Sequence, residues 1–239
     1  MKNRYSCLGL SLFLLLAAAG SLVNAAQNEQ PAGSKARLFV AEFRDKSAGG
    51  SLDTVCLQQF GLTWKAIGEG MRDMMTTALF KTGRFVIVER DQLSEIIREQ
   101  DLGASGRVQK GTEPAIGEIK GADLMIVASV TEFDSGAQGL KGSFDVGRIK
   151  IGGRTGKAHM AIDVRVVDVK TSEVLAATTV DGSAANVGVE GVKGVFDNPS
   201  PSSLGGFSKT PMEKALRACI EKSVKYICDN TPPAYFRYK

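Results

Sequence analysis

Three charged side chains follow a short apolar run within residues 82–100, TGRFVIVERDQLSEIIREQ. Glu89, Arg90 and Asp91 stand where a strand is expected to end and a helix to begin. Ligands and catalytic groups usually gather at the carboxyl ends of strands in open α/β sheets. An active site with acid–base side chains is therefore the first hypothesis for this charged cluster.

The partners that such a site needs are not found in the sequence. His159 is the only histidine, so no histidine-based metal cluster or catalytic triad can be assembled. The stretch IGGRTGKAH resembles a phosphate loop, but three residues instead of four separate Gly152 from Gly156, and Ala158 replaces the hydroxyl that binds the metal. We therefore predict no catalytic residue, no metal and no cofactor, and an enzyme that uses the charged cluster remains only a residual hypothesis.

A structural interpretation of the cluster follows. Asp91 is placed to cap the exposed N–H groups of the following helix, while Glu89 and Arg90 are candidate contacts to a neighbouring subunit.

The N-terminus has the features of a secretory signal peptide. Lys2 and Arg4 precede an apolar run from Leu8 to Ala19 and the small-residue stretch VNAA, which predicts cleavage after Ala25. The run is shorter than the ~20 apolar residues of a membrane-spanning helix. Residues 1–25 are therefore assigned to the signal peptide and 26–35 to a polar leader. Loss of Lys2 and Arg4 lowers the formal charge of +4 to about +2, too balanced to indicate nucleic acid.

The first half of the remaining chain predicts alternating strands and helices. ARLFVAEFRD is a strand, and residues 47–64 form a long connection with no clear period. Apolar residues at three and four residue spacing predict a helix from Trp64 to Lys81, which ends at Gly83. RFVIV is then a short strand. A second helix should bury Leu93, Ile96 and Ile97.

The second half predicts a short helix from Thr112 to Gly121 and a strand from Asp123 to Phe133. Alternating residues predict a β-hairpin around the turn KTSE. The final helix should begin with Thr210 as its N-cap, Pro211 in the first turn and Glu213 in a capping box. The expected fold class is α/β, a mixed sheet flanked by helices, with the domain spanning 36–230 and a tail at 231–239.

Two glycine-rich stretches, 132–158 and 181–209, exceed the usual length of loops without structure. Each is about as long as two ~10-residue strands and a turn, the size of a hairpin in an outer-membrane barrel. Residues 149–151 lie on a shifted register that would need a bulge near Gly147. The pattern alone leaves barrel hairpins and flexible surface loops as equal alternatives. Candidate lipid-facing residues are Phe144, Val146, Ala185, Val187 and Val189.

The cysteines permit one disulfide in the exported chain. Cys7 leaves with the signal peptide, and Cys219 and Cys228 lie nine residues apart on one predicted helix, too far apart to pair. Cys56 could pair with either of them, and the alternative is that all three are small buried residues.

The order of these segments resembles the CsgG/HfaB family of curli secretion channels and related outer-membrane assembly proteins. The resemblance rests on four stretches: VAEFRDKS, MRDMMTTALFKTGRFVIVERDQLSEIIREQDL, AIGEIKGADLMIVASVTEFD and AHMAIDVRVVDVKTSEVLAATTVDG. It implies a periplasmic α/β domain whose copies form a ring, with two hairpins per subunit joining a shared outer-membrane β-barrel. Such a channel exports unfolded protein without bound nucleotide.

The resemblance also suggests where the pore would narrow. The loop after the first strand does so in the family, which indicates Gln58, Gln59 and Phe60 here. The curli channel is a lipoprotein with a modified cysteine at its mature N-terminus, whereas this sequence has an ordinary cleavage site.

The expected function is a non-enzymatic subunit of a homo-oligomeric outer-membrane channel for the secretion and assembly of extracellular fibres or adhesins. Its partners would be further copies of the chain, an exported unfolded protein and accessory periplasmic proteins, with no nucleic acid. The alternative is a soluble periplasmic scaffold or regulator of envelope assembly with the same core. The expected location is accordingly the outer membrane, facing the periplasm, or the soluble periplasm.

Overall fold

The computed structural model describes residues 33–47, 52–135, 145–146, 149–150, 157–185 and 210–239. The predicted signal peptide and most of the polar leader lie outside these residues. So do Phe144, Val187 and Val189, three of the candidate lipid-facing residues.

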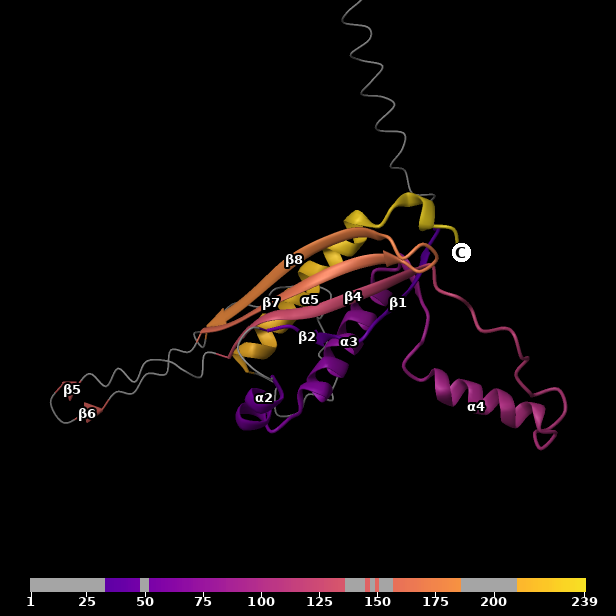
Figure 1. Ribbon diagram of the computed structural model, residues 1–239, viewed down its shortest axis with the longest axis horizontal. Helices are drawn as coiled ribbons and strands as arrows, with labels where there is room; N and C mark the ends of the chain where they lie inside the picture. Colours follow the sequence, from indigo (N-terminus) through magenta and orange to yellow (C-terminus); the bar gives the residue numbers. More distant parts are fainter. Residues whose placement is uncertain (1–32, 48–51, 136–144, 147–148, 151–156, 186–209) are drawn as a thin grey trace, which may run out of the picture.

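A six-stranded mixed sheet organises the chain (Figure 1). Its main order is β3 (Phe85–Ile87), β1 (Ala36–Val40), β4 (Leu124–Asp134), β7 (Lys157–Asp168) and β8 (Val174–Ala185). The first three strands are parallel, β7 and β8 are antiparallel to their neighbours, and the short β2 (Arg44–Asp45) pairs with β4. The predicted mixed α/β fold is confirmed.

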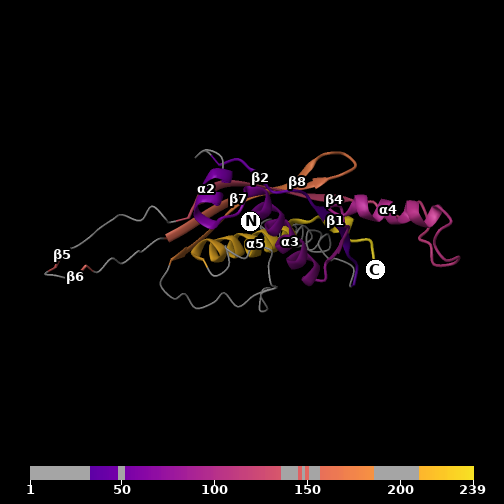
Figure 2. The ribbon, with the colours of Figure 1, turned by 90° about the horizontal axis from the view of Figure 1, so that it is seen from below.

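Two long helices, α3 (Trp64–Lys81) and α5 (Pro211–Asn230), cover one face of this sheet (Figures 1 and 2). The first follows the predicted bounds: the Thr63 hydroxyl accepts a hydrogen bond from Ala66 N at 3.2 Å, and Gly83 follows with a φ of +70°. Alternate strand residues point at the helices and are buried with them. The large, fully buried core side chains include Leu38, Ile67, Met71, Met75, Leu79, Phe85, Leu124, Ile126, Met160 and Ile162.

The contact between β8 and α5 is unusually close. A Cβ atom built on Gly182 would lie 2.0 Å from the carbonyl oxygen of Ala215 and 2.9 Å from the Sγ of Cys219. Only glycine permits this approach of strand to helix. The Thr210 hydroxyl accepts a hydrogen bond from Glu213 N at 3.1 Å, which confirms the predicted N-cap of α5.

The opposite face of β4, β7 and β8 has a different character, because the strand period places the remaining side chains there. Cross-strand pairs align Met125 with Val167, Val127 with Arg165, and Ser129 with Asp163. Most of these side chains are half-buried, whereas their strand neighbours on the helix side are buried. In the part of the chain that the structure describes, the two long helices α3 and α5 pack on the sheet from the other face. We call this uncovered surface the open sheet face.

The C-terminal tail packs onto the body. Lys35 pairs with Tyr238, Phe236 is buried with its ring centroid 6.0 Å from that of Phe85, and Arg237 forms an ion pair with Asp123 at 2.9 Å. The Tyr235 hydroxyl, from the 3₁₀ helix η2 (Pro233–Tyr235), donates a hydrogen bond to Asp168. This bond lowers the pKa of the Asp168 carboxyl and raises that of Tyr235 to about 12.

Three local predictions were wrong. A helix, α2 (Leu52–Phe60), lies within the segment predicted as an irregular connection. No helix forms over residues 112–121, because Gly111 and Gly117 adopt φ values of +87° and +89° and Pro114 interrupts the segment. The helix α4 (Leu93–Ala104) does form, but Ile96 and Ile97 are 37% and 44% exposed instead of buried.

Part of the first glycine-rich stretch is also described. The short strands β5 (Asp145–Val146) and β6 (Ile149–Lys150) pair antiparallel, with Val146 opposite Ile149. The bulge predicted near Gly147 lies outside the described residues. Among the described helices, none combines the length and apolar character required to cross a membrane.

Replacement of Gly182 by alanine should lower the free energy of unfolding by roughly 3 kcal/mol, because the new methyl group would overlap the backbone of α5. Urea unfolding followed by circular dichroism measures this change. Gly121→Ala is the matched control, since a Cβ there has no neighbour within 4 Å. Equal stability of the two variants would show that β8 and α5 are not in contact as described.

Candidate functional site

The charged cluster lies at the carboxyl ends of β1 and β3, where the sequence places it. Arg72, a residue of α3 that the sequence analysis did not single out, forms an ion pair with Asp91 at 2.6 Å. Its side chain is only 14% exposed. Asp91 is therefore not the helix cap that we predicted. The N-cap position of α4 is Gln92, which makes no side-chain capping bond.

Glu89 takes over the capping role. Its Oε1 atom accepts hydrogen bonds from the backbone N–H groups of Asp91 at 2.6 Å and Gln92 at 3.2 Å. Arg90 donates a hydrogen bond to the carbonyl oxygen of Lys120 at 3.0 Å and lies 5.9 Å from the ring centroid of Phe39. Glu89 and Arg90 thus fix the two ends of the segment between β3 and β4, which carries α4 and which we call the α4 excursion.

A cavity of about 270 Å³ lies among these residues, lined also by Asp73 and Thr76. Burial is the main reason that the pKa of the Asp73 carboxyl is raised. The other charged groups of the cavity already have partners: Arg72 pairs with Asp91, and Glu89 and Arg90 bind backbone groups. The arrangement supports the fold around it, and within the described ranges no group of three or more metal-ligating side chains occurs.

The other end of the sheet is where both glycine-rich stretches leave the body. The first connects the end of β4 to the start of β7, and the second connects the end of β8 to the start of α5. The strands remain paired up to these points: Asp134 lies opposite His159, and Lys157 lies opposite Ala185. Ala185, a candidate lipid-facing residue, is therefore the last paired residue of β8.

The candidate pore residues lie at this same end, on α2 (Figure 1). Gln58 and Gln59 are exposed, whereas Phe60 is half-buried and meets Phe133 of β4 edge to face, with ring centroids 6.4 Å apart. Phe133 was not recognised as a site residue from the sequence. The structure thus brings Gln58, Gln59 and Phe60 next to the root of the first glycine-rich stretch.

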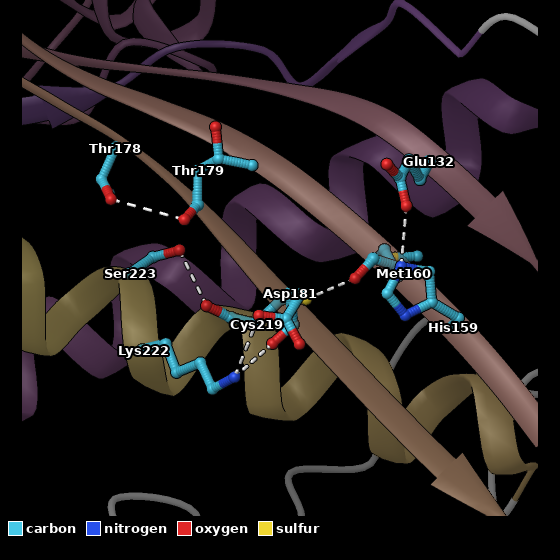
Figure 3. A network of polar contacts seen from close by, with 9 residues as sticks. All are labelled: Glu132, His159, Met160, Thr178, Thr179, Asp181, Cys219, Lys222 and Ser223. Atoms are coloured by element: carbon cyan, nitrogen blue, oxygen red, sulfur yellow. Dashed lines mark hydrogen bonds and ion pairs between the residues drawn. The ribbon is translucent and has the colours of Figure 1, made fainter.

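Polar contacts reinforce the sheet at this end (Figure 3). His159 Nε2 lies 2.8 Å from Glu132 Oε2 and joins β7 to β4 on the open sheet face. On the helix side, Cys219 donates to the carbonyl oxygen of Met160 at 3.4 Å. Lys222 donates to the carbonyl oxygen of Asp181 at 2.6 Å. The single histidine therefore has a partner between two strands.

The three cysteines of the described chain are free thiols. Burial raises the pKa of Cys56 to about 11 and that of Cys219 to about 12, and it also raises the pKa of Cys228. All three are thus protonated at neutral pH, and Cys56 and Cys219 behave as the small buried residues that the sequence analysis considered.

The sequence of this chain is similar to those of known proteins. The family model described as "Curli production assembly/transport component CsgG" matches residues 18–233. A protein of Neisseria meningitidis serogroup B named "Putative lipoprotein NMB1126/NMB1164" is 29% identical over 112 residues. That match covers 46% of this chain and 43% of the relative, so the chain spans less than half of the relative's length.

Two solved structures are similar at low identity. The hypothetical protein CT253 of Chlamydia trachomatis has a TM-score of 0.44 at 12% identity, and the match covers 82% of this chain and 100% of that one. The PelC dodecamer of Paraburkholderia phytofirmans has a TM-score of 0.37 at 11% identity, with 82% and 92% covered.

Replacement of Glu89 by alanine should lower the free energy of unfolding by about 1 kcal/mol, because two backbone N–H groups lose their acceptor. Glu89→Gln keeps an oxygen acceptor and should retain most of this stability. Thermal or urea unfolding of both variants separates the two cases. An equal loss in both would assign the effect to the charge of Glu89 rather than to its capping bonds.

Proposed function

The chain belongs to the family of the curli production assembly/transport component CsgG, and from this premise we propose that it is a non-enzymatic subunit of a homo-oligomeric outer-membrane secretion channel. Copies of the chain would form a ring, and the stretches 132–158 and 181–209 of each copy would contribute hairpins to a shared β-barrel. The cargo would be an unfolded protein destined for extracellular fibres or adhesins.

The observation that carries this proposal is the convergence of three features at one end of the sheet. Both glycine-rich stretches leave from that end, and α2 with its exposed amides lies there too. In a ring, the roots of the hairpins and the residues that line the passage must occupy the same level. The fold supplies this arrangement within one subunit.

The strand pairing supports the first hairpin in particular. Asp134 and His159 are partners in an antiparallel ladder, so a ladder that continued outward from them would be a hairpin with the correct geometry. The antiparallel pairing of β5 with β6 within this stretch agrees with such a hairpin. The second stretch begins on the paired strand β8 and returns to α5.

The side chains of α2 suit an unfolded cargo. Gln58 and Gln59 present amides that can exchange hydrogen bonds with a passing backbone, and Phe60 is held in place by Phe133. A ring of amides and fixed aromatic side chains would contact an extended chain without holding it tightly. We assign the constriction to these three residues and place the protein, as an exported protein, in the cell envelope.

A second candidate function, a periplasmic scaffold that does not form a barrel, is favoured by one observation. The outer edge of β8 is partly occupied, since Lys222 donates to the carbonyl oxygen of Asp181 and Tyr226 donates to that of Ala177 at 2.8 Å. Side chains that occupy an edge strand oppose pairing with another chain. A soluble, monomeric protein in the periplasmic fraction would support this candidate.

Lysine at Val187 and Val189 should prevent membrane assembly, because each charge near the bilayer midplane costs roughly 2–4 kcal/mol. Fractionation followed by sizing in mild detergent measures the loss of the large membrane species. Val169→Lys is the control, since Val169 is 45% exposed on the turn between β7 and β8, at the opposite end of the sheet. Unchanged assembly of the double variant would refute lipid exposure of these valines.

A further inference from the structure

The helix α4 stands apart from the other helices and the sheet (Figures 1 and 2). It projects from the body beyond the β3 edge, and Gly103 is its one buried residue. That residue faces Pro114 and Glu113 of the returning segment, whose atoms lie 3.0 and 3.3 Å from the position of a built Cβ. Isolated helices of about 12 residues are marginal in water, so α4 requires a partner surface.

One face of α4 is suited to such a partner. The helical period brings Leu93, Ile96, Ile97 and Ala104 onto one stripe with Gln100 among them, and Ile96 and Ile97 are 37% and 44% exposed. Leu102 lies on the opposite face. The stripe is therefore an apolar surface without a cover among the residues that the structure describes.

Acidic side chains border this stripe. Glu99 lies on one side of it and Asp101 on the other, and neither has an ion-pair partner in the described chain. The single basic residue of the helix, Arg98, pairs with Glu95 at 2.7 Å. The helix thus carries a net charge of about −2, which disfavours pairing of two α4 helices with each other.

The open sheet face likewise has no covering helix in the described part of the chain. Met125, Val127 and Val167 form an apolar strip, and Val174 at its margin is 53% exposed. Beside the strip is a hollow of about 360 Å³ whose lining includes Lys46, Arg165, the buried Ser129 and Asp163, whose carboxylate accepts a hydrogen bond from Thr179. Neither cation has an ion-pair partner in the described ranges.

We propose that α4 of one copy lies across the open sheet face of the neighbouring copy, with its apolar stripe on Met125 and Val127 and its acidic margin towards Lys46 and Arg165. This inference rests on the proposed homo-oligomer and names the surfaces that build it. Helices cover both faces of the sheet in many layered α/β domains, and the described residues contain both a helix that packs on no sheet and a sheet face that no helix covers.

The attachment of the α4 excursion to the β3 edge explains why the partner would be a second copy of the chain. Arg90 binds the carbonyl oxygen of Lys120 at 3.0 Å, and Arg37 binds that of Gly121 at 3.2 Å. These bonds tie the excursion to the β3 edge, whereas the open sheet face lies on β4, β7 and β8 towards the other edge. Contact between two different surfaces of identical subunits is heterologous, the kind that generates a ring when the rotation between subunits closes.

Cysteine cross-linking between differently tagged copies tests the contact in the full chain extracted in mild detergent. One copy carries Ile97→Cys and the other Ala177→Cys, which lies opposite Arg165 on the exposed strand β8. A short bismaleimide should join the two tags, while Leu102→Cys, on the far face of α4, should give at least tenfold less product. Absence of the cross-link in an intact assembly would overturn the proposal.

A charge exchange provides the second measurement. Arg165→Glu and Asp101→Lys should each raise the dissociation constant of the assembly at least tenfold, and the double variant should recover most of the loss, as measured by light scattering. Variants that assemble like the wild type would overturn the α4 contact and leave the channel proposal standing. A wild-type protein that remains a single subunit would overturn both.

Discussion

The close approach of β8 to α5 at Gly182 is the constraint on which the rest of the structure depends. Because a backbone carbonyl of the helix takes the place of a strand side chain, α5 lies flat along β7 and β8. Together with α3 it buries one complete face of the sheet. In the described part of the chain both long helices pack on that face, and the open sheet face is where we propose that a neighbouring copy binds.

This arrangement gives the two ends of the sheet different tasks. One end releases both glycine-rich stretches and carries α2, so residues that touch a membrane or a cargo would belong there. The other end is closed by the C-terminal tail, whose Tyr235 and Arg237 bind Asp168 and Asp123. The charged cluster anchors α4 beside the sheet. The long strands of the sheet thus connect the side on which we propose subunit contacts through α4 with the end that we assign to the channel.

Local patterns in the sequence predict most of the body, while contacts between distant residues explain what they do not predict. The apolar period of α3 and the Thr210 cap of α5 are local signals, and both are confirmed. The periodicity of α4 predicts a helix correctly but says nothing of what covers it. Asp91 is a residue type that often caps helices. Arg72 approaches it from another helix, so Asp91 forms an ion pair instead.

In the candidate site, too, local features can be predicted from the sequence, whereas contacts between distant residues cannot. Charges at the ends of β1 and β3 can be predicted, because a strand, turn and helix are read locally. The meeting of Phe60 with Phe133 cannot, since 73 positions separate them and no spacing rule links them. Two glycines and a proline in residues 111–117 are a local signal against a helix, and they outweigh the apolar residues nearby.

The most direct test of the central claim is the electrical conductance of the purified protein in a planar lipid bilayer, after extraction from outer membranes in mild detergent. A channel subunit predicts discrete openings from a large assembly, with a conductance that changes when Gln59 is replaced by a bulkier or charged residue. A protein that leaves the bilayer silent and purifies from the periplasm as a single subunit would contradict the account.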